Sequence, residues 1–183
     1  MKFSDIKICC FDIDGTLTDG IYQITDKGDI VKSFYTRDFY GIEQLIRNGI
    51  KVVILSQSHD EVIYHQINRI VDHSILWEQA YEHDESLEVI TCIDNKKEEI
   101  EKILEKENLS WSNVAYIGDA ENDIESMEKA LFVGCPFDAI NEISKNLPSL
   151  SYLSSYVSKF PGGKGAVYDF SKYILKKIEE EEL

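Results

Sequence analysis

Four short runs of apolar, β-prone residues divide the chain, at residues 6–11, 50–55, 114–117 and 131–134. Turn residues or polar side chains close each run, which is typical of a buried strand. Residues 156–157 are a candidate for a further, very short strand. Segments with helical spacing lie between the runs. This alternation predicts an α/β fold, with helices packed against a central parallel sheet.

Five segments have the pattern or the beginning of a helix. They are residues 38–48, a segment that opens at His59 and Asp60, and residues 95–107, 122–130 and 166–178. Asn48-Gly49 is expected to end the first of them. The acidic residues 179–182, after the last helix, are expected to form a frayed tail.

Two further β-prone runs, at residues 21–25 and 30–35, flank the turn Asp26-Lys27-Gly28-Asp29 and predict a hairpin. About fifteen residues cannot build a core of their own, so this is a hairpin insertion at about 20–36 and not a cap domain. Residues 72–93 are ambiguous. Residues 75–77 and 89–92 are each candidates for a short strand, and residues 81–88 are expected to be an acidic surface loop.

Length and composition limit the class of protein. The 183 residues are enough for a single domain, expected to span 1–183. A formal net charge of −15 opposes binding to nucleic acid or to an anionic membrane, because phosphate attraction needs clusters of Lys and Arg. The polar N-terminus and the lack of a long apolar run predict a soluble cytoplasmic protein. The four cysteines show no C-x-x-C pairing and are expected to be reduced thiols in the core.

The first apolar run ends in Asp12 and Asp14, which Gly15-Thr16 follows. Carboxylates at the carboxyl end of a buried strand lie where open α/β sheets bind their ligands. A spacing of two places both side chains on one face of an extended chain, and a turn at Gly15 still allows them to converge. Such a pair needs a cation or a shared proton, and Mg²⁺ takes carboxylates together with phosphate oxygens. In isolation, D-x-D is more often a turn or a helix cap.

Other polar groups follow the later runs. Ser56 follows the second run, Asp119 the third, Asp123 lies one helical turn further, and Lys96 opens a helix. Each has a simpler explanation. Ser56 fits a strand-end turn, Lys96 a solvated lysine with Lys97 as its competitor, and Asp123 an exposed acid at a helix start. Together, at one edge of a parallel sheet, they supply what phosphoryl transfer through an aspartyl intermediate needs.

The stretch FDIDGTLTDG resembles the first motif of the haloacid dehalogenase (HAD) superfamily. Ser56, Lys96 and the segment GDAENDIESM are similar to its second, third and fourth motifs, so the resemblance covers most of the chain. The resemblance implies a Rossmannoid three-layer sandwich with a central parallel sheet. It also implies an Mg²⁺-dependent phosphatase.

The same resemblance assigns expected roles. Asp12 is expected to be the nucleophile and Asp14 the general acid and base. Ser56 and Lys96 are expected to bind the phosphate. The metal ligands are expected to be Asp12, the backbone carbonyl of Asp14, and Asp119, with Asp123 in support.

VKSFYTRDFYGIEQL, PFDA and GGKGAVYD resemble one capless branch of the superfamily. The branch contains 3-deoxy-D-manno-octulosonate 8-phosphate (KDO-8-phosphate) phosphatases, sialate- or nononate-9-phosphate phosphatases and a domain of CMP-sialate synthetases. It implies a phosphorylated 2-keto-3-deoxy sugar acid as substrate, with Arg37 and Lys164 contacting its carboxylate or hydroxyls. It also implies a homotetramer whose hairpins meet at the centre, each active site being closed by a neighbouring subunit.

The chain departs from this branch at two motif positions, and its segment between the helix after the second strand and Lys96 is longer than expected. Ser56-Gln57-Ser58 stands where members usually have Thr-Gly-Arg, and Phe39 stands where many have glycine. These departures leave the hydrolytic residues intact and bear on which sugar acid is bound.

Two other classes of protein compete with this interpretation. A non-catalytic tetramerisation or interaction module with the HAD fold would be expected to have lost Asp12 or Asp14, and both are present. A response-regulator receiver also gathers acids, Ser or Thr and Lys around Mg²⁺. Its phosphorylated aspartate follows a middle strand, whereas here the acidic pair follows the first.

Overall fold

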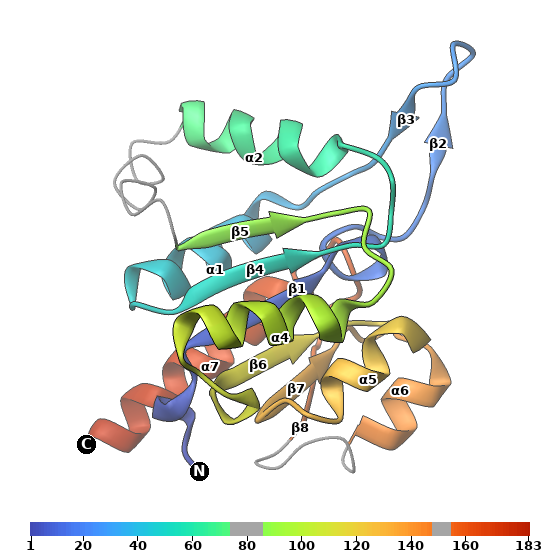
Figure 1. The fold of residues 1–183 in the computed structure, drawn as a ribbon. Helices are drawn as coiled ribbons and strands as arrows, with labels where there is room; N and C mark the ends of the chain where they lie inside the picture. The colour runs from blue at the N-terminus through green and yellow to red at the C-terminus, as the bar shows by residue number, and fades with distance from the viewer. Residues whose placement is uncertain (74–85, 148–154) are drawn as a thin grey trace.

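Six parallel strands form the centre of the molecule, in the spatial order β5-β4-β1-β6-β7-β8 (Figure 1). The computed structural model describes residues 1–73, 86–147 and 155–183. The sheet strands are β1 (Ile8–Asp12), β4 (Lys51–Leu55), β5 (Leu87–Ile90), β6 (Val114–Ile117), β7 (Phe132–Cys135) and β8 (Ser155–Val157). The helices are α1 (Thr36–Arg47), α2 (Val62–His73), α4 (Lys96–Glu107), α5 (Ile124–Met127), α6 (Asn141–Asn146) and α7 (Ala166–Glu182).

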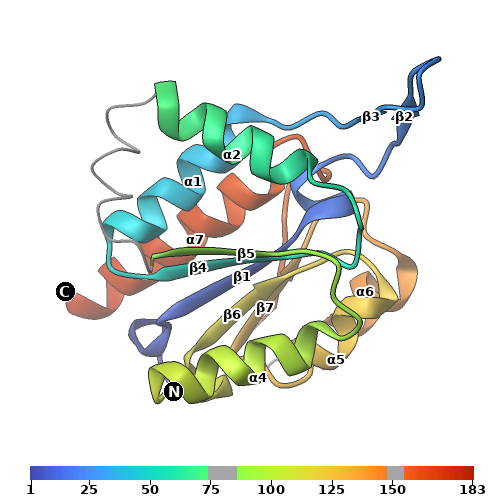
Figure 2. The ribbon, with the colours of Figure 1, turned by 45° about the horizontal axis from the view of Figure 1, so that its top comes forward.

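Helices cover both faces of this sheet (Figure 2). Helices α1, α2 and α7 lie on one face, and α4, α5 and α6 lie on the other. Since alternate residues of a strand point to opposite faces, β1 contributes to both cores. Cys9 and Phe11 pack with residues of α1 and α7, while Ile8 and Cys10 pack with residues of α4 and α5. The predicted three-layer α/β fold with a central parallel sheet is therefore confirmed.

Most predicted elements are present with shifted ends. The run at 114–117 coincides with β6. The helix predicted at 122–130 is shorter, because a turn at Glu121–Asp123 precedes α5. The strand expected at 89–92 lies two residues earlier, as β5. Residues 87–88, which were expected to belong to the loop, are therefore part of this strand. Residues 75–77 and 81–85 lie outside the described residues. The sequence pattern does not predict α6, since Ile143 alone is buried among its six residues.

The predicted frayed tail at 179–182 is wrong. Helix α7 continues to Glu182. The Glu181 carboxylate accepts hydrogen bonds from the backbone amides of Phe3 at 2.8 Å and Ser4 at 3.0 Å. The two ends of the chain thus lie side by side, at the end of the sheet from which β1 starts (Figure 1). The partner that orders the tail lies far away in the sequence, so local composition gives no sign of it.

A two-stranded hairpin projects from this body (Figure 1). Its strands β2 (Gln23–Ile24) and β3 (Ile30–Val31) are antiparallel and shorter than the runs that predicted them. The turn closes as expected, with the amide of Gly28 donating to the carbonyl of Thr25 at 3.0 Å. Its apolar side chains are largely exposed, including Ile21 at 60% and Ile24 at 71%.

The four cysteines are unpaired. Cys9, Cys10 and Cys135 are buried, as expected of core thiols, whereas Cys92 is exposed, so for Cys92 the expectation is wrong. In the part of the chain that the structure describes, every helix is too short or too polar to cross a lipid bilayer.

Candidate active site

The carboxyl ends of neighbouring strands bring the predicted polar residues to one edge of the sheet. Asp12 is the last residue of β1 and pairs in register with Leu55, so Ser56 follows directly beside it. On the other side of β1, Phe11 pairs with Ile117 of β6, which Gly118 and Asp119 follow. Parallel pairing fixes this arrangement, because all the strands end on the same side.

The chain turns sharply immediately after Asp12. Gly15 has a φ of +96°, a left-handed conformation that favours glycine. A side chain at this position would also collide with the carboxylate of Asp119. Thr16, in the same turn, donates a hydrogen bond to Oδ1 of Asp119 at 3.2 Å. The Asp-Gly-Thr sequence therefore serves to bring the turn against the end of β6.

Three carboxylates meet at this edge. Asp12, Asp119 and Asp123 each offer an oxygen, and these oxygens lie within 4.8 Å of one another. Asp12 is only 5% exposed and Asp123 is fully buried. Burial, followed by the charge of Asp123, raises the pKa of Asp119 to about 6. The sequence therefore correctly predicted that Asp12 and Asp119 lie close enough to share a cation.

Lys96 is buried against this group. It is the first residue of α4, after the N-cap Asn95, and its ammonium contacts Oδ1 of Asp12 and, at 2.7 Å, Oδ1 of Asp123. Burial alone would lower the pKa of Lys96, but the two carboxylates outweigh it and raise the pKa. Its competitor Lys97 instead pairs with Glu125 at 3.4 Å and is partly exposed.

The charge of this cluster indicates what it can hold. Three carboxylates and one ammonium leave an excess of two negative charges when all four groups are ionised. A divalent cation balances that excess, and oxygen ligands at a phosphate site suit Mg²⁺. The donor set therefore fits the expected magnesium ion.

Asp123 is already saturated by protein donors. Its Oδ1 accepts from the hydroxyl of Tyr116 at 2.6 Å and from Lys96, and its Oδ2 accepts from the amides of Asp119 at 3.0 Å and Ala120 at 3.1 Å. A carboxylate has about four acceptor sites, so little capacity is left for a metal ion. Asp123 therefore fixes Lys96 and the Asp119 loop, while Asp12 and Asp119 keep acceptor capacity for a metal ion.

Asp14 lies apart from the three-carboxylate group, and the expected convergence of the Asp12 and Asp14 side chains is not found. Its Oδ1 pairs with the ammonium of Lys32 at 2.7 Å, and its Oδ2 accepts from the hydroxyl of Tyr22 at 3.1 Å. The turn at 13–17 rotates Asp14 out of line with Asp12. The Asp14 carboxylate is directed towards the ammonium of Lys32 and the hydroxyl of Tyr22, both carried by the hairpin.

The remaining predicted residues surround the same edge. Ser56 is 3% exposed, and its Oγ accepts from the amide of Ser58 at 2.9 Å, which leaves its hydroxyl hydrogen to donate. Arg37 is exposed in the first turn of α1, and Lys164 is exposed in the loop before α7. Neither side chain contacts the acidic cluster in the described residues, so their roles remain predictions.

The glycine-rich loop before α7 supports the turn after Asp12. The amide of Gly163 donates to the carbonyl of Thr16 at 3.0 Å, and a side chain at Gly162 would overlap the carbonyl of Gly15. Buried Asp38 anchors this loop by accepting from the amides of Gly165 at 3.2 Å and Tyr168 at 2.8 Å. Burial raises the pKa of Asp38 to about 6 despite these bonds.

Sequence reasoning missed four polar residues that reach the site: Tyr22, Lys32, Asp60 and Tyr116. Lys32 follows a two-residue strand and Tyr116 is an apolar-looking member of a buried run, so neither carried a distinguishing signal. Only the fold brings them beside Asp14 and Asp123.

The chain is similar in sequence to known proteins. Residues 40–130 match the model of the haloacid dehalogenase-like hydrolase family. The chain is 27% identical over 174 residues to the 3-deoxy-D-manno-octulosonate 8-phosphate phosphatase KdsC of Escherichia coli, covering 95% of this chain and 81% of that protein. It is also 27% identical over 172 residues to the N-acylneuraminate cytidylyltransferase A of Danio rerio, covering 93% of this chain. The chain spans about a third, 35%, of the length of that cytidylyltransferase.

A solved structure agrees with these relatives. The cobalt-bound form of a deoxy-D-mannose-octulosonate 8-phosphate phosphatase from Haemophilus influenzae superimposes with a TM-score of 0.76 at 26% identity. The match covers 97% of this chain and 91% of that one.

Proposed function

Because the chain belongs to the haloacid dehalogenase-like hydrolases, we propose that it is an Mg²⁺-dependent phosphatase acting on a phosphorylated 2-keto-3-deoxy sugar acid. The substrate is expected to be KDO-8-phosphate or a nononate or sialate 9-phosphate. One observation carries the proposal: the buried Lys96 joins Asp12 to Asp123, with Asp119 beside them. Burying three ionisable groups together, with Asp119 partly buried beside them, is costly for a fold, and such groups are typical of functional sites.

The reaction begins with Asp12. A carboxylate oxygen of Asp12 attacks phosphorus, the bond from phosphorus to the sugar oxygen breaks, and Asp14 gives its proton to that oxygen. The product is an aspartyl-phosphate and a free sugar acid. Asp14, now a carboxylate, takes a proton from water as the water attacks phosphorus. The bond to Asp12 then breaks, which releases inorganic phosphate and restores Asp14 as an acid.

The phosphoryl group needs positive partners during both steps. Lys96 and the hydroxyl of Ser56 lie at the same strand edge as Asp12. In the proposal, both donate hydrogen bonds to the equatorial oxygens of the phosphoryl group. Asp12, Asp119 and the backbone carbonyl of Asp14 would hold Mg²⁺, which would supply further charge neutralisation for the phosphate. Asp123 keeps Lys96 and the Asp119 loop in place.

The sugar-acid part of the proposal rests on the relatives. The phosphatases of E. coli and H. influenzae are named for the 8-phosphate of deoxy-mannose-octulosonate, and the Danio relative is named for N-acylneuraminate, another acidic sugar. Arg37 and Lys164 are exposed cations in the segments that adjoin the site and are proposed to contact the substrate carboxylate or hydroxyls. Serine at position 58, where the branch usually has arginine, bears on which acid fits.

The experiment measures phosphate release, with and without Mg²⁺, from a generic aryl phosphate and from a panel of 2-keto-3-deoxy sugar phosphates. We expect Mg²⁺-dependent release from both and the highest kcat/KM within the sugar-acid panel. Lys96→Met should abolish this release. Lys97→Met is its matched control, since both variants change one lysine at the start of α4. The lack of release from every phosphate would refute the proposed activity, whereas a preference for neutral sugar phosphates would refute only the substrate class.

We further propose that copies of the chain assemble into a tetramer through the hairpin. In one chain the side chains of Ile21 and Ile24 in the hairpin are 60% and 71% exposed. A hairpin without a core of its own favours burial of these side chains against a partner chain. Light scattering on a gel-filtered sample tests this. A mass of four chains is expected, and a monomer would contradict it.

A further inference from the structure

A second cluster of charges lies beside the acidic cluster, at the base of the hairpin. Lys32, immediately after β3, places its ammonium 2.7 Å from Oδ1 of Asp14 and 2.6 Å from Oδ2 of Asp60. The side chain of Lys32 is only 2% exposed, although the hairpin around it is open to solvent. A lysine buried to this degree between two carboxylates is held in one place.

Asp60 anchors the far end of this arrangement. Its carboxylate accepts a hydrogen bond from the hydroxyl of Ser58 and another, at 3.2 Å, from the amide of Val62 at the start of α2. Ser58 stands where the related branch usually has arginine, and the cation that contacts its partner Asp60 is Lys32 of the hairpin. The pKa of Asp60 is lowered, since burial would raise it but Lys32 and Ser58 outweigh burial.

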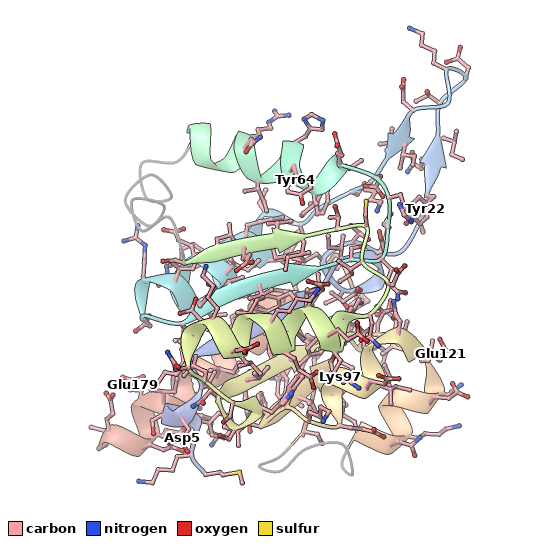
Figure 3. The ribbon with its side chains drawn as sticks, viewed as in Figure 1. Asp5, Tyr22, Tyr64, Lys97, Glu121 and Glu179 are labelled. Carbon is pink, nitrogen blue, oxygen red and sulfur yellow. The ribbon has the colours of Figure 1, made fainter. Side chains whose placement is uncertain are left out.

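Tyr22 closes the cluster from the other arm of the hairpin. Its hydroxyl donates to Oδ2 of Asp14 at 3.1 Å and lies 3.3 Å from the hydroxyl of Ser58. The ammonium of Lys32 lies 4.7 Å from the centre of the Tyr22 ring, within reach of a cation–π interaction. Figure 3 shows Tyr22 where the hairpin meets the end of the sheet to which the strands point. Both arms of the hairpin therefore hold Asp14.

Asp14 has little support from its own turn. The hydroxyl of Thr18 is 3.5 Å from Oδ1, a weak contact. A group that transfers a proton to a leaving oxygen must lie within hydrogen-bond reach of it, and small displacements are costly to the rate. The direction of the Asp14 carboxylate thus depends on Lys32 and Tyr22.

We propose that Lys32 is the positioning residue for Asp14 and that Asp60 in turn holds Lys32. The inference rests on the proposed phosphatase function, in which Asp14 protonates the leaving oxygen. Lys32 does not touch the transferred phosphoryl group; it acts through Asp14. The hairpin is thereby a part of the active site of its own chain.

Leaving-group dependence tests this directly. An alkyl phosphate needs a general acid, whereas dinitrophenyl phosphate releases a stable anion and does not. We expect Lys32→Met to lower kcat/KM for an alkyl phosphate by about 10–100-fold, part of the 10²–10⁴ that general acids typically supply. For dinitrophenyl phosphate, the same variant should keep kcat/KM within about threefold, because phosphoryl transfer to Asp12 then needs no proton.

The control is Lys27→Met, which removes the same charge from the exposed hairpin turn and should leave both substrates unchanged. Asp60→Asn keeps Lys32 and should show the same selective loss to a smaller degree, so it tests the proposal even if Lys32→Met does not fold. Equal losses on both substrates, or a rise in KM alone, would mean that Lys32 is structural or binds phosphate, and the proposal would be wrong. If the wild type hydrolyses neither substrate, the proposed function fails and the inference fails with it.

Discussion

Two lysines at the candidate site, Lys96 and Lys32, each bridge two carboxylates, and they lie on different parts of the fold. Lys96 joins Asp12 to Asp123 from the first turn of α4, inside the three-layer body. Lys32 joins Asp14 to Asp60 from an exposed hairpin. Both ammonium groups are almost fully buried. In the proposed mechanism, the body thus fixes the groups that would hold phosphate and metal, and the hairpin fixes the group that would move protons.

This division has a physical reason. The nucleophile and its cation partners must resist displacement by a charged substrate, so they belong on strand ends and a helix start packed between two cores. In the proposed mechanism proton transfer belongs to Asp14, whose partners Lys32 and Tyr22 come from the hairpin. Four predictions compare the body with the hairpin.

The largest expected effect is that of Asp12→Asn. An amide is a poor nucleophile, so turnover on any phosphate ester should fall by about a thousandfold or more. The fold should keep or gain thermal stability, because one of three crowded carboxylates loses its charge. Steady-state rates and thermal unfolding measure both. A variant that retains a tenth of the wild-type activity would show that Asp12 is not the nucleophile.

Lys96→Met should destabilise the protein as well as inactivate it. The change leaves buried Asp12 and Asp123 without their shared cation, which typically costs about 3–5 kcal/mol. Lys32→Met should cost less, about 1–2 kcal/mol, because the side chain of Asp14 is 23% exposed and Asp60, although only 9% exposed, keeps its hydrogen bonds from Ser58 and Val62. Urea unfolding of both variants measures the difference. Equal losses of stability would remove the distinction between body and hairpin.

The buried acid behind the glycine-rich loop predicts a pH dependence of the body. Folded Asp38 keeps its proton up to about pH 6, whereas the unfolded carboxyl loses it near pH 4. Between these values the unfolded state binds fewer protons, so stability falls as pH rises from about 4 to about 6 and then levels off. Asp38→Asn should remove about 2–3 kcal/mol of this fall.

The control for this measurement is Asp26→Asn, in the exposed hairpin turn, which should keep the wild-type pH profile. Unfolding free energies of the three proteins at several pH values give the comparison. A wild-type stability that rises between pH 4 and pH 6 in parallel with that of Asp38→Asn would contradict the assignment.

The smallest effect on the folded chain is expected for Ile24→Asp. Ile24 is 71% exposed within one chain, so a charge there should leave the unfolding free energy of a monomer almost unchanged. If copies meet through the hairpin, the same change should lower the mass in solution. Light scattering beside thermal unfolding separates the two. An unchanged tetramer would place the subunit contacts elsewhere.

The sequence was informative about the body and much less so about the hairpin-borne cluster. Buried strands that end in Asp12, Ser56 and Asp119 are visible as apolar runs, and parallel pairing forces their ends together. The partners of Asp14 are not visible in this way, because Lys32 and Tyr22 approach it only after the chain turns at Gly15 and the hairpin folds back. The order of the C-terminal tail was missed for a similar reason, since Glu181 finds its partners at Phe3 and Ser4.

The most direct test of the account is to trap the covalent intermediate. Wild-type protein with Mg²⁺ is mixed with an excess of aryl phosphate, quenched with acid during the first turnover and digested, and the peptides are weighed. We predict that the peptide containing Asp12 carries one phosphoryl group on that residue, and that Asp14→Asn accumulates more of it because water is no longer activated. Phosphate release with no phosphorylated peptide, or with the phosphoryl group on another residue, would contradict the central claim.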